Sequence, residues 1–382
     1  MNIPFNKIHL TGNELDYITQ ALKLGSISGE GQFSDKVSCL LEDKLDSSKI
    51  IMTTSGTHAL EMAMMLLNIK RGDEVIMPSY TFPSTANAVL LRGGKPVFVD
   101  IQESTLTMDL EQVERKITKY TKAIIPVHYG GVGCPMDQVM CLSEKYHLFV
   151  VEDAAQALGS TYKNKPLGTW GHIGCFSFHG TKNYVSGEGG ALSINENDDA
   201  LFERAEIIRQ KGTNRHQFIR GDISKYTWVD IGSSYSPSDI LMAMLYPQIE
   251  DMIGIMEKRR HLVEEYRYHL KKYLNMGIIR SMTDIPEHYT SNYHNFYILF
   301  RDEVMRNHVM EELSKYDISA CIHFVPLHTS PKGLKLGYKQ GDLPITERVS
   351  DTLLRLPLYT DMTGNELNYM KEKLSDILED LV

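Results

Sequence analysis

The stretch Gly174-Cys-Phe-Ser-Phe-His-Gly-Thr-Lys182-Asn-Tyr-Val-Ser-Gly187-Glu-Gly-Gly190-Ala191 is the one around which the chain is organised. Its small and aromatic residues at 175–178 predict a buried strand. A Gly-rich turn follows, and the apolar run at 191–194 predicts another strand. Between the two lies one lysine, Lys182. Lysines are ordinarily solvated, so the importance of Lys182 depends on the motifs that accompany it.

Upstream of this stretch, predicted strands and helices alternate. Apolar runs predict strands at residues 50–52, 74–77, 96–99, 123–127 and 148–152, with helices ending near 67 and spanning 84–91, 110–117 and 136–146. Such alternation predicts an α/β fold with a largely parallel sheet covered by helices on both faces. Ligands of these sheets bind beyond the carboxyl ends of the strands.

The length of 382 residues favours two domains. We expect a large domain at 1–250, whose N-terminal segment can pack on the other domain, and a smaller C-terminal α+β domain at 251–382. A long helix over 238–274, kinked at Pro247, would leave the large domain. The remainder predicts strands at 295–300 and 320–324, and helices at 304–316 and 365–381.

Composition excludes several classes of function. The net charge of −9 argues against a nucleic-acid-binding face. The five cysteines are widely spaced and form no CxxC pair, so neither a disulfide framework nor a metal site is predicted. The chain shows no signal segment and no apolar run long enough to span a membrane. A cytoplasmic protein is expected.

Polar motifs follow several of the predicted strands. Ser55-Gly56-Thr57 joins a strand to a helix, where glycine and free N–H groups suit a phosphate, although an ordinary helix cap has the same pattern. Asp153 comes directly after the strand predicted at 148–152, and Gln156 lies three residues further on. A carboxylate there either caps the next segment or keeps a pyridine nitrogen protonated.

Two further residues complete this set. Phe82 follows a strand and either belongs to the core or stacks on a planar ring. Ser177, five residues before Lys182, can join a phosphate cup. Each motif suits one part of pyridoxal phosphate, and together they require one amine to form a Schiff base. Lys182 is the candidate.

The motifs and their order resemble the DegT/DnrJ/EryC1/StrS family of nucleotide-sugar aminotransferases over essentially the whole chain. They are Ser55-Gly-Thr-x-Ala-Leu60, Glu152-Asp-Ala-Ala-Gln156, Ser177-Phe-His-x-x-Lys182 and Gly187-Glu-Gly-Gly190, joined by Gly29-Glu-Gly31, Pro126-Val-His-Tyr-Gly130 and His323-Phe-Val-Pro-Leu-His328. The resemblance implies the aspartate-aminotransferase-like (type I) fold and a pyridoxal 5′-phosphate cofactor.

The resemblance also assigns roles. It implies that Lys182 and Asp153 are catalytic. It also implies that the cofactor is bound by Gly56, Thr57, Phe82, Gln156 and Ser177. It implies a homodimer in which a residue of one subunit reaches the cofactor phosphate of the other. Many members carry Asn at that position, whereas this chain has the shorter Ser234. His128, His179 and His294 are taken as structural.

Within the family, the runs Lys211-Gly-Thr-Asn-Arg215, Lys225-Tyr-Thr-Trp228 and Asp230-Ile-Gly-Ser-Ser-Tyr235 resemble enzymes that aminate C4 of dTDP-4-keto-6-deoxyglucose. The implied partners are this dTDP-sugar and L-glutamate. Candidate substrate-binding residues are Arg215, His323 and His328, with Lys211 and Arg220 as further positive charges for the diphosphate. Two alternatives stay open: a 3-aminotransferase acting on a 3-keto sugar, and a non-catalytic cofactor-binding regulator.

Overall fold

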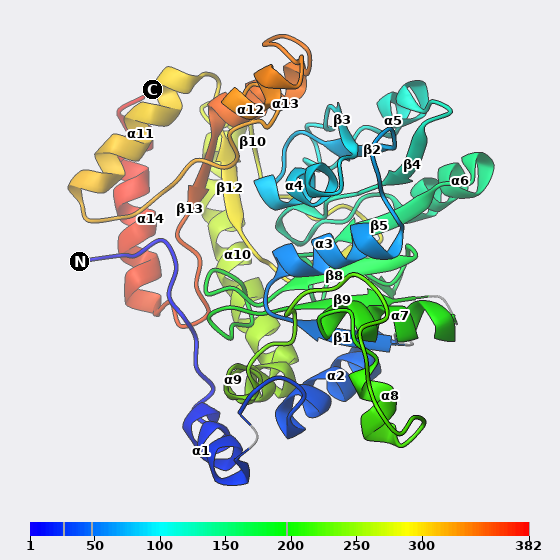
Figure 1. The fold of residues 1–382 in the computed structure, drawn as a ribbon. Coiled ribbons are helices and arrows are strands. Elements are labelled where there is room, and N and C mark those ends of the chain that lie inside the picture. Colours follow the sequence, from blue (N-terminus) through cyan, green and yellow to red (C-terminus); the bar gives the residue numbers. More distant parts are fainter. Residues whose placement is uncertain (26, 47–48, 196–197, 382) are drawn as a thin grey trace.

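A seven-stranded mixed sheet forms the centre of the larger part of the molecule (Figure 1). The computed structural model describes residues 1–25, 27–46, 49–195 and 198–381. The strand order is β1-β9-β8-β5-β4-β2-β3. The strands are β1 (Lys49–Thr53), β2 (Glu74–Pro78), β3 (Lys95–Val99), β4 (Thr121–Ile124), β5 (Phe149–Asp153), β8 (Ile173–Ser177) and β9 (Gly190–Ile194).

Five of these strands, β2, β3, β4, β5 and β8, run parallel, as the alternating pattern predicts. Strand β9 is antiparallel to both of its neighbours, β8 and β1. The reversal follows from the connection between β8 and β9, which contains no helix and so cannot make a parallel crossover. That connection is the segment that carries Lys182.

Helices cover both faces of this sheet (Figure 1). Because neighbouring residues of a strand point to opposite faces, Val150 and Val151 of β5 belong to two different hydrophobic clusters, one on each side. The helices of this part are α1 (Glu14–Leu24), α2 (Gln32–Leu45), α3 (Gly56–Leu66), α4 (Pro83–Leu91), α5 (Leu110–Lys116), α6 (Met136–Tyr146), α7 (Asp199–Arg209), α8 (Arg215–Arg220) and α9 (Asp239–Glu250).

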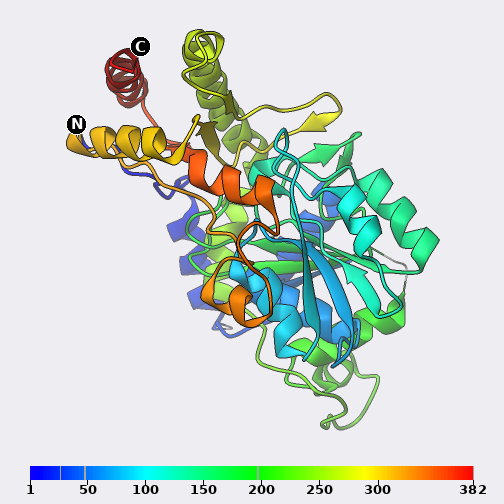
Figure 2. The ribbon, with the colours of Figure 1, turned by 90° about the horizontal axis from the view of Figure 1, so that it is seen from above.

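A second, antiparallel sheet of three strands lies beside the first. It contains β10 (Ser281–Met282), β12 (Phe296–Leu299) and β13 (Leu353–Leu356). A separate hydrophobic cluster joins this sheet to α10 (Met252–Asn275), α11 (Glu303–Lys315) and α14 (Gly364–Glu379). The N-terminus lies on this side of the molecule (Figure 1, Figure 2), where the amide of Ile3 donates to the carbonyl of Asp317 at 2.9 Å.

Short elements complete the chain. A third sheet consists of β6 (Thr161–Tyr162), β7 (Lys165–Pro166) and β11 (Tyr289–Thr290), and the short helices are η1 (Tyr129–Gly131), α12 (Pro331–Lys335) and α13 (Pro344–Thr352). In the described ranges, no helix has both the length and the apolar character needed to cross a bilayer. The proposed domain limits at 1–250 and 251–382 stay a prediction.

Two predicted elements differ from the structure. The single helix over 238–274 is wrong, because the chain forms α9 and α10 and leaves helical geometry at Asp251 (φ −90°, ψ 22°) rather than at Pro247. The strand at 320–324 is also wrong. Only Cys321 pairs there, through a bridge to Arg355, since the neighbouring edge strand β13 is short. The sequence patterns also did not predict helix α8 or strand β13.

Candidate active site

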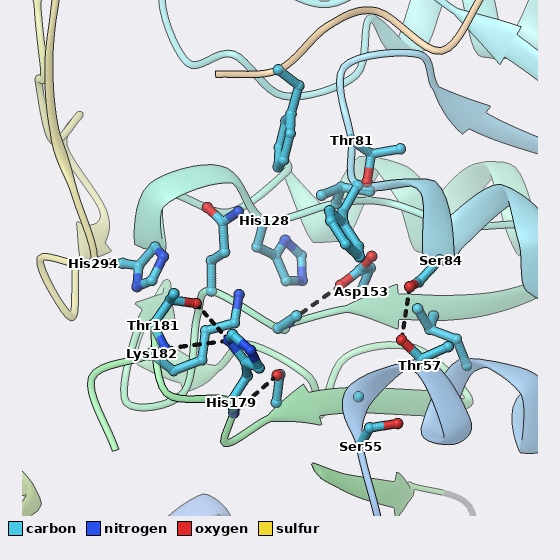
Figure 3. A pocket seen from close by; sticks show the side chains of 18 of the residues that line it. Ser55, Thr57, Thr81, Ser84, His128, Asp153, His179, Thr181, Lys182 and His294 are labelled. Carbon is cyan, nitrogen blue, oxygen red and sulfur yellow. Dashed lines mark hydrogen bonds between the residues drawn. The ribbon is translucent and has the colours of Figure 1, made fainter. Parts of the chain in front are cut away.

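A cavity of about 520 Å³ opens at the carboxyl ends of the parallel strands, next to the small sheet. Its walls come from the starts of α3 and α4, the ends of β5 and β8, and the segment after β8. It brings together eight of the predicted site residues: Gly56, Thr57, Phe82, Asp153, Gln156, Ser177, Lys182 and His323. Figure 3 shows the side chains of Thr57, Asp153 and Lys182 around this space.

The amine of Lys182 extends into the cavity from the loop after β8 (Figure 3). Burial lowers its pKa to about 8, although the carboxylate of Asp153 opposes this shift, and the charge of Arg355 contributes to it. Removal from water penalises the charged ammonium. Lys182 is therefore closer than an ordinary lysine to the neutral form that a nucleophile requires.

Asp153 ends β5 with its carboxylate facing the cavity, and only 5% of the residue is exposed. One oxygen accepts a hydrogen bond from the hydroxyl of Thr85 at 2.7 Å, and the other accepts from the amide of Ala155 at 3.3 Å. The second bond is the capping contact that the sequence also allowed. The first fixes the orientation of the carboxylate at the cavity wall.

Gln156 lies beside Asp153 on the cavity wall. Its side-chain oxygen accepts from the amide of Gly130 at 2.8 Å. This bond fixes the orientation of the carboxamide, so the NH₂ group is the end that Gln156 has left to donate to a ligand oxygen.

The N-terminus of α3 forms an anion cup with the end of β8. Ser55 caps the helix, and its hydroxyl accepts from the amide of His58 at 3.1 Å. A Cβ at Gly56 would lie 2.9 Å from the Cβ of Ser177, so only glycine allows this close approach. The hydroxyls of Thr57 and Ser84 are 2.7 Å apart (Figure 3). Helix N-termini with such hydroxyls suit a phosphate.

Phe82 stands before Pro83 at the start of α4, and 59% of the residue is exposed although it lines the cavity. It is therefore not a core aromatic, which removes the main alternative to ring stacking. The cup, the carboxylate of Asp153, the NH₂ group of Gln156, the ring of Phe82 and the amine of Lys182 fit the phosphate, ring and aldehyde of pyridoxal phosphate.

Three predicted residues lie outside the residues that line the cavity: Ser234, Arg215 and His328. Ser234 is exposed and forms a bridge with Gln210. The guanidinium of Arg215 pairs with Glu30 at 2.9 Å. His328 is buried, and its ring nitrogens contact the hydroxyl of Ser79 at 2.8 Å and the carboxylate of Glu347 at 2.9 Å. Their roles in binding stay predictions.

Several cavity residues were not expected to face a ligand. His128, His179 and His294 were taken as structural, yet all three line the cavity (Figure 3). His128 also makes a structural contact, with its Nε2 2.8 Å from Glu152. The sequence signal for His128 and His179 was their place within matched motifs. Arg355 gave no such signal, because it interrupts a leucine-rich run far from the others.

Comparisons with known proteins agree with this geometry. The model of the DegT/DnrJ/EryC1/StrS aminotransferase family matches residues 9–375. The chain is 36% identical to the uncharacterized protein MJ1066 of Methanocaldococcus jannaschii, over 86% of this chain and 85% of that one. It is 31% identical to the GDP-perosamine synthase of Escherichia coli O157:H7, over 99% of each chain.

A solved structure agrees as well. Spr1654 from Streptococcus pneumoniae, in its PLP form, superposes with a TM-score of 0.92 at 26% identity, over 100% of both chains. The expected type I fold and the pyridoxal phosphate cofactor are thereby confirmed. The chain belongs to the DegT/DnrJ/EryC1/StrS aminotransferase family and is a pyridoxal-phosphate-dependent sugar aminotransferase.

Proposed function

We propose that this enzyme transfers the amino group of L-glutamate to C4 of a dTDP-linked 4-keto-6-deoxyhexose, giving a dTDP-4-amino-4,6-dideoxyhexose for cell-surface polysaccharide synthesis. The observation that carries the amino-transfer chemistry is the single cavity that contains Lys182 and Asp153. The sugar position rests on the sequence run 211–235, where the resemblance to C4 aminotransferases is strongest.

Each residue of the cavity has a separate role in this reaction. Pyridoxal phosphate supplies an electron sink when bound. Lys182 holds the cofactor between turnovers and, when released, moves a proton between the α-carbon of the amino donor and C4′ of the cofactor. Asp153, fixed by Thr85, keeps the ring nitrogen protonated. The cup formed by Gly56, Thr57 and Ser177 binds the phosphate.

Ring binding requires two further contacts. Phe82, exposed at the cavity wall, stacks on one face of the ring. Gln156 donates its NH₂ group to the phenolate oxygen, because its carbonyl is already engaged by Gly130. His323 also lines the cavity, and burial holds its pKa well below the usual range, so it meets the sugar as a neutral hydrogen-bonding group.

The diphosphate is proposed to contact Arg215, whose side chain is 49% exposed and has one carboxylate partner, Glu30, among the residues that the structure describes. Glu30 is also paired with Arg209 at 3.1 Å, so its carboxylate is shared between two arginines. Arg220 is a poorer candidate, because Glu203 and Asp222 both pair with it. The polar loop at Ser234 is proposed to reach the partner subunit's cofactor.

The nucleotide and the aminated carbon can be tested in one substrate comparison. A relative is named GDP-perosamine synthase, so a GDP-linked 4-keto sugar is the second candidate. We would incubate the holoenzyme and L-glutamate with dTDP-4-keto-6-deoxyglucose, its 3-keto isomer or the GDP-linked 4-keto sugar, and assign the product by NMR. We expect amination at C4, with the highest rate for the dTDP-linked substrate.

Other outcomes have definite meanings. Faster turnover of the 3-keto isomer would overturn the regiochemistry, and faster turnover of the GDP sugar would overturn the nucleotide. A cofactor spectrum that does not change with L-glutamate would overturn the choice of amino donor. In Arg215→Ala, KM for the sugar nucleotide should rise while the glutamate half-reaction is unchanged. An equal loss of rate in both half-reactions would show that Arg215 has a structural role and does not contact the substrate.

A further inference from the structure

Arg355 lines the cavity and presents a guanidinium group there. It belongs to strand β13 of the small sheet. Along β13, Leu354 and Leu356 pack into the core shared with α10 and α14, whereas Leu353 packs in the cluster of Tyr80 and Tyr129. Because side chains alternate along a strand, Arg355 lies on the same face as Leu353. That face is turned toward the large sheet and the cavity.

The guanidinium of Arg355 has unused binding capacity. Its Nε is buried without a hydrogen-bond partner, and none of the carboxylates in the described part of the chain lies within ion-pair distance of it. The buried guanidinium of Arg259, by comparison, has hydrogen-bond acceptors. That arginine is 4% exposed and donates to the carbonyls of Tyr293 and His294 at 2.9 and 2.8 Å. Buried cations are normally satisfied in this way.

The ring of Phe5 supports the guanidinium instead, with its centroid 4.8 Å from Cζ of Arg355. Such a cation–π contact orients a guanidinium without occupying its N–H groups. The segment that contains Phe5 is held to the loop that follows β13, because the amide of Leu358 donates to the carbonyl of Phe5 at 3.4 Å. The N–H fork is therefore positioned and free to bind an anion.

The other basic groups of the cavity are paired, neutral or committed to the cofactor. Against the burial that lowers it, hydrogen bonds with Cys134 and Glu152 raise the pKa of His128 to about 9, but this charge is paired with the carboxylate of Glu152 at 2.8 Å. His179 lies 3.8 Å from the carboxylate of Glu188.

Burial, together with the charges of Lys182 and Arg355, holds the pKa values of His294 and His323 well below their usual range, so both are neutral at pH 7. Lys182, whose pKa is lowered to about 8, is committed to the cofactor. Arg355 is left as the permanent cation beside the reacting amine.

We propose that Arg355 binds the α-carboxylate of the amino donor, an inference that rests on the proposed function. In an α-amino acid the carboxylate is attached to the carbon that bears the reacting amine, so both groups must enter the same cavity. A planar guanidinium matches a carboxylate through two parallel hydrogen bonds. The diphosphate of a sugar nucleotide is attached at C1, across the ring from C4, and is the less suitable anion for this position.

The test compares the wild-type holoenzyme with Arg355→Leu, Arg355→Lys and a control, Arg301→Leu. Arg301 has a side chain that is 75% exposed and does not line the cavity. Calorimetry would measure binding of glutarate, an unreactive dicarboxylate. Single-turnover absorbance would measure the half-reaction with L-glutamate, and the half-reaction of the amine-loaded enzyme with the keto sugar would be measured separately.

We expect Arg355→Leu to weaken binding of glutarate and of L-glutamate on the order of 10- to 100-fold. Arg355→Lys should recover part of the loss, because it restores charge but not the fork. The sugar half-reaction and the Arg301→Leu enzyme should be unchanged. Phe5→Leu should weaken L-glutamate binding less than Arg355→Leu, because Phe5 acts only by positioning Arg355.

Each other outcome contradicts the assignment. A wild-type glutamate half-reaction in Arg355→Leu overturns it and leaves the proposed function intact. Loss confined to the sugar half-reaction assigns Arg355 to the diphosphate instead, and equal loss in both makes it structural. If the wild-type enzyme itself does not react with L-glutamate, the choice of amino donor in the proposed function fails, and the assignment of Arg355 fails with it.

Discussion

The amine of Lys182 sits in surroundings that penalise its charge. Burial lowers its pKa to about 8, and only the neutral amine attacks an aldehyde. We therefore expect the rate at which the apoprotein takes up pyridoxal phosphate to rise as the pH increases through about 8 and to level off above it. Stopped-flow absorbance of the apoprotein mixed with the cofactor measures this rate.

The control for this pH profile is Asp153→Asn. The negative charge of Asp153 raises the pKa of Lys182, so its removal should lower that pKa and move the midpoint of the profile to lower pH. A rate that keeps rising to about pH 10, as for an ordinary lysine, would contradict the assigned environment of Lys182.

The same substitution tests the role of Asp153 in turnover. Asp153→Asn should retain the cofactor, since the anion cup at α3 is untouched, but an amide cannot hold the ring nitrogen protonated. We expect the single-turnover rate to fall roughly 10²-fold or more. The exposed Asp222→Asn serves as the matched control. If both variants react at near-normal rates, Asp153 is only a cap.

Sequence and structure agree best for residues in local motifs. Gly56, Asp153 and Lys182 each lie at the end of a strand of the large sheet or a few residues after it, so parallel topology alone brings them to one edge. Arg355 enters the same cavity from β13, through packing between two sheets. A single arginine among leucines has no local pattern, and its position could not be predicted.

At the scale of elements, Glu152 ties β5 to the loop before β8. It is fully buried, and its oxygens accept from the amides of Gly168, Trp170 and Gly171 at 2.7–2.8 Å and contact His128. Glu152→Gln replaces one acceptor by an NH₂ group facing donors. We expect the free energy of unfolding to fall by about 1–3 kcal/mol, measured by urea denaturation.

The matched control is Glu111→Gln, because the side chain of Glu111 is 81% exposed and makes only an i,i+4 pair with Arg115. Its effect on the free energy of unfolding should stay within about 0.5 kcal/mol. Equal stability of the two variants would show that the loop at 168–171 does not depend on Glu152.

The boundaries of elements show where sequence patterns stop being informative. Six strands of the large sheet were located within one or two residues, because each is a short apolar run between polar segments. The exception is β4, which ends at Ile124, three residues before the predicted end at 127. The break between α9 and α10 was not, since apolar helical spacing continues through Asp251. The strand expected at 320–324 failed because pairing depends on the partner strand, which the segment itself does not reveal.

At the scale of the whole molecule, several large apolar side chains are exposed in the N-terminal region and in the segment 218–231. They include Leu15 (76%), Leu24 (56%), Trp228 (74%) and Ile231 (59%). Exposed apolar side chains favour association, because contact with another chain removes them from water. We expect a homodimer with composite sites, and sedimentation velocity should give twice the chain mass.

Complementation tests the composite site itself. Inactive Lys182→Ala mixed with an inactive variant lacking residues 232–235 should regain part of the activity, because a hybrid dimer contains one intact site. A monomer at working concentration, or a mixture that stays inactive, would contradict the shared arrangement proposed for Ser234.

The central claim is that one cavity, at the carboxyl edge of the large sheet, uses Lys182 to hold pyridoxal phosphate. Borohydride reduction of the purified holoenzyme, followed by peptide mapping with mass spectrometry, tests it most directly. The account predicts a reduced pyridoxyl label on Lys182, and no label in Lys182→Ala. A label found mainly on any other lysine of the wild-type protein would contradict it.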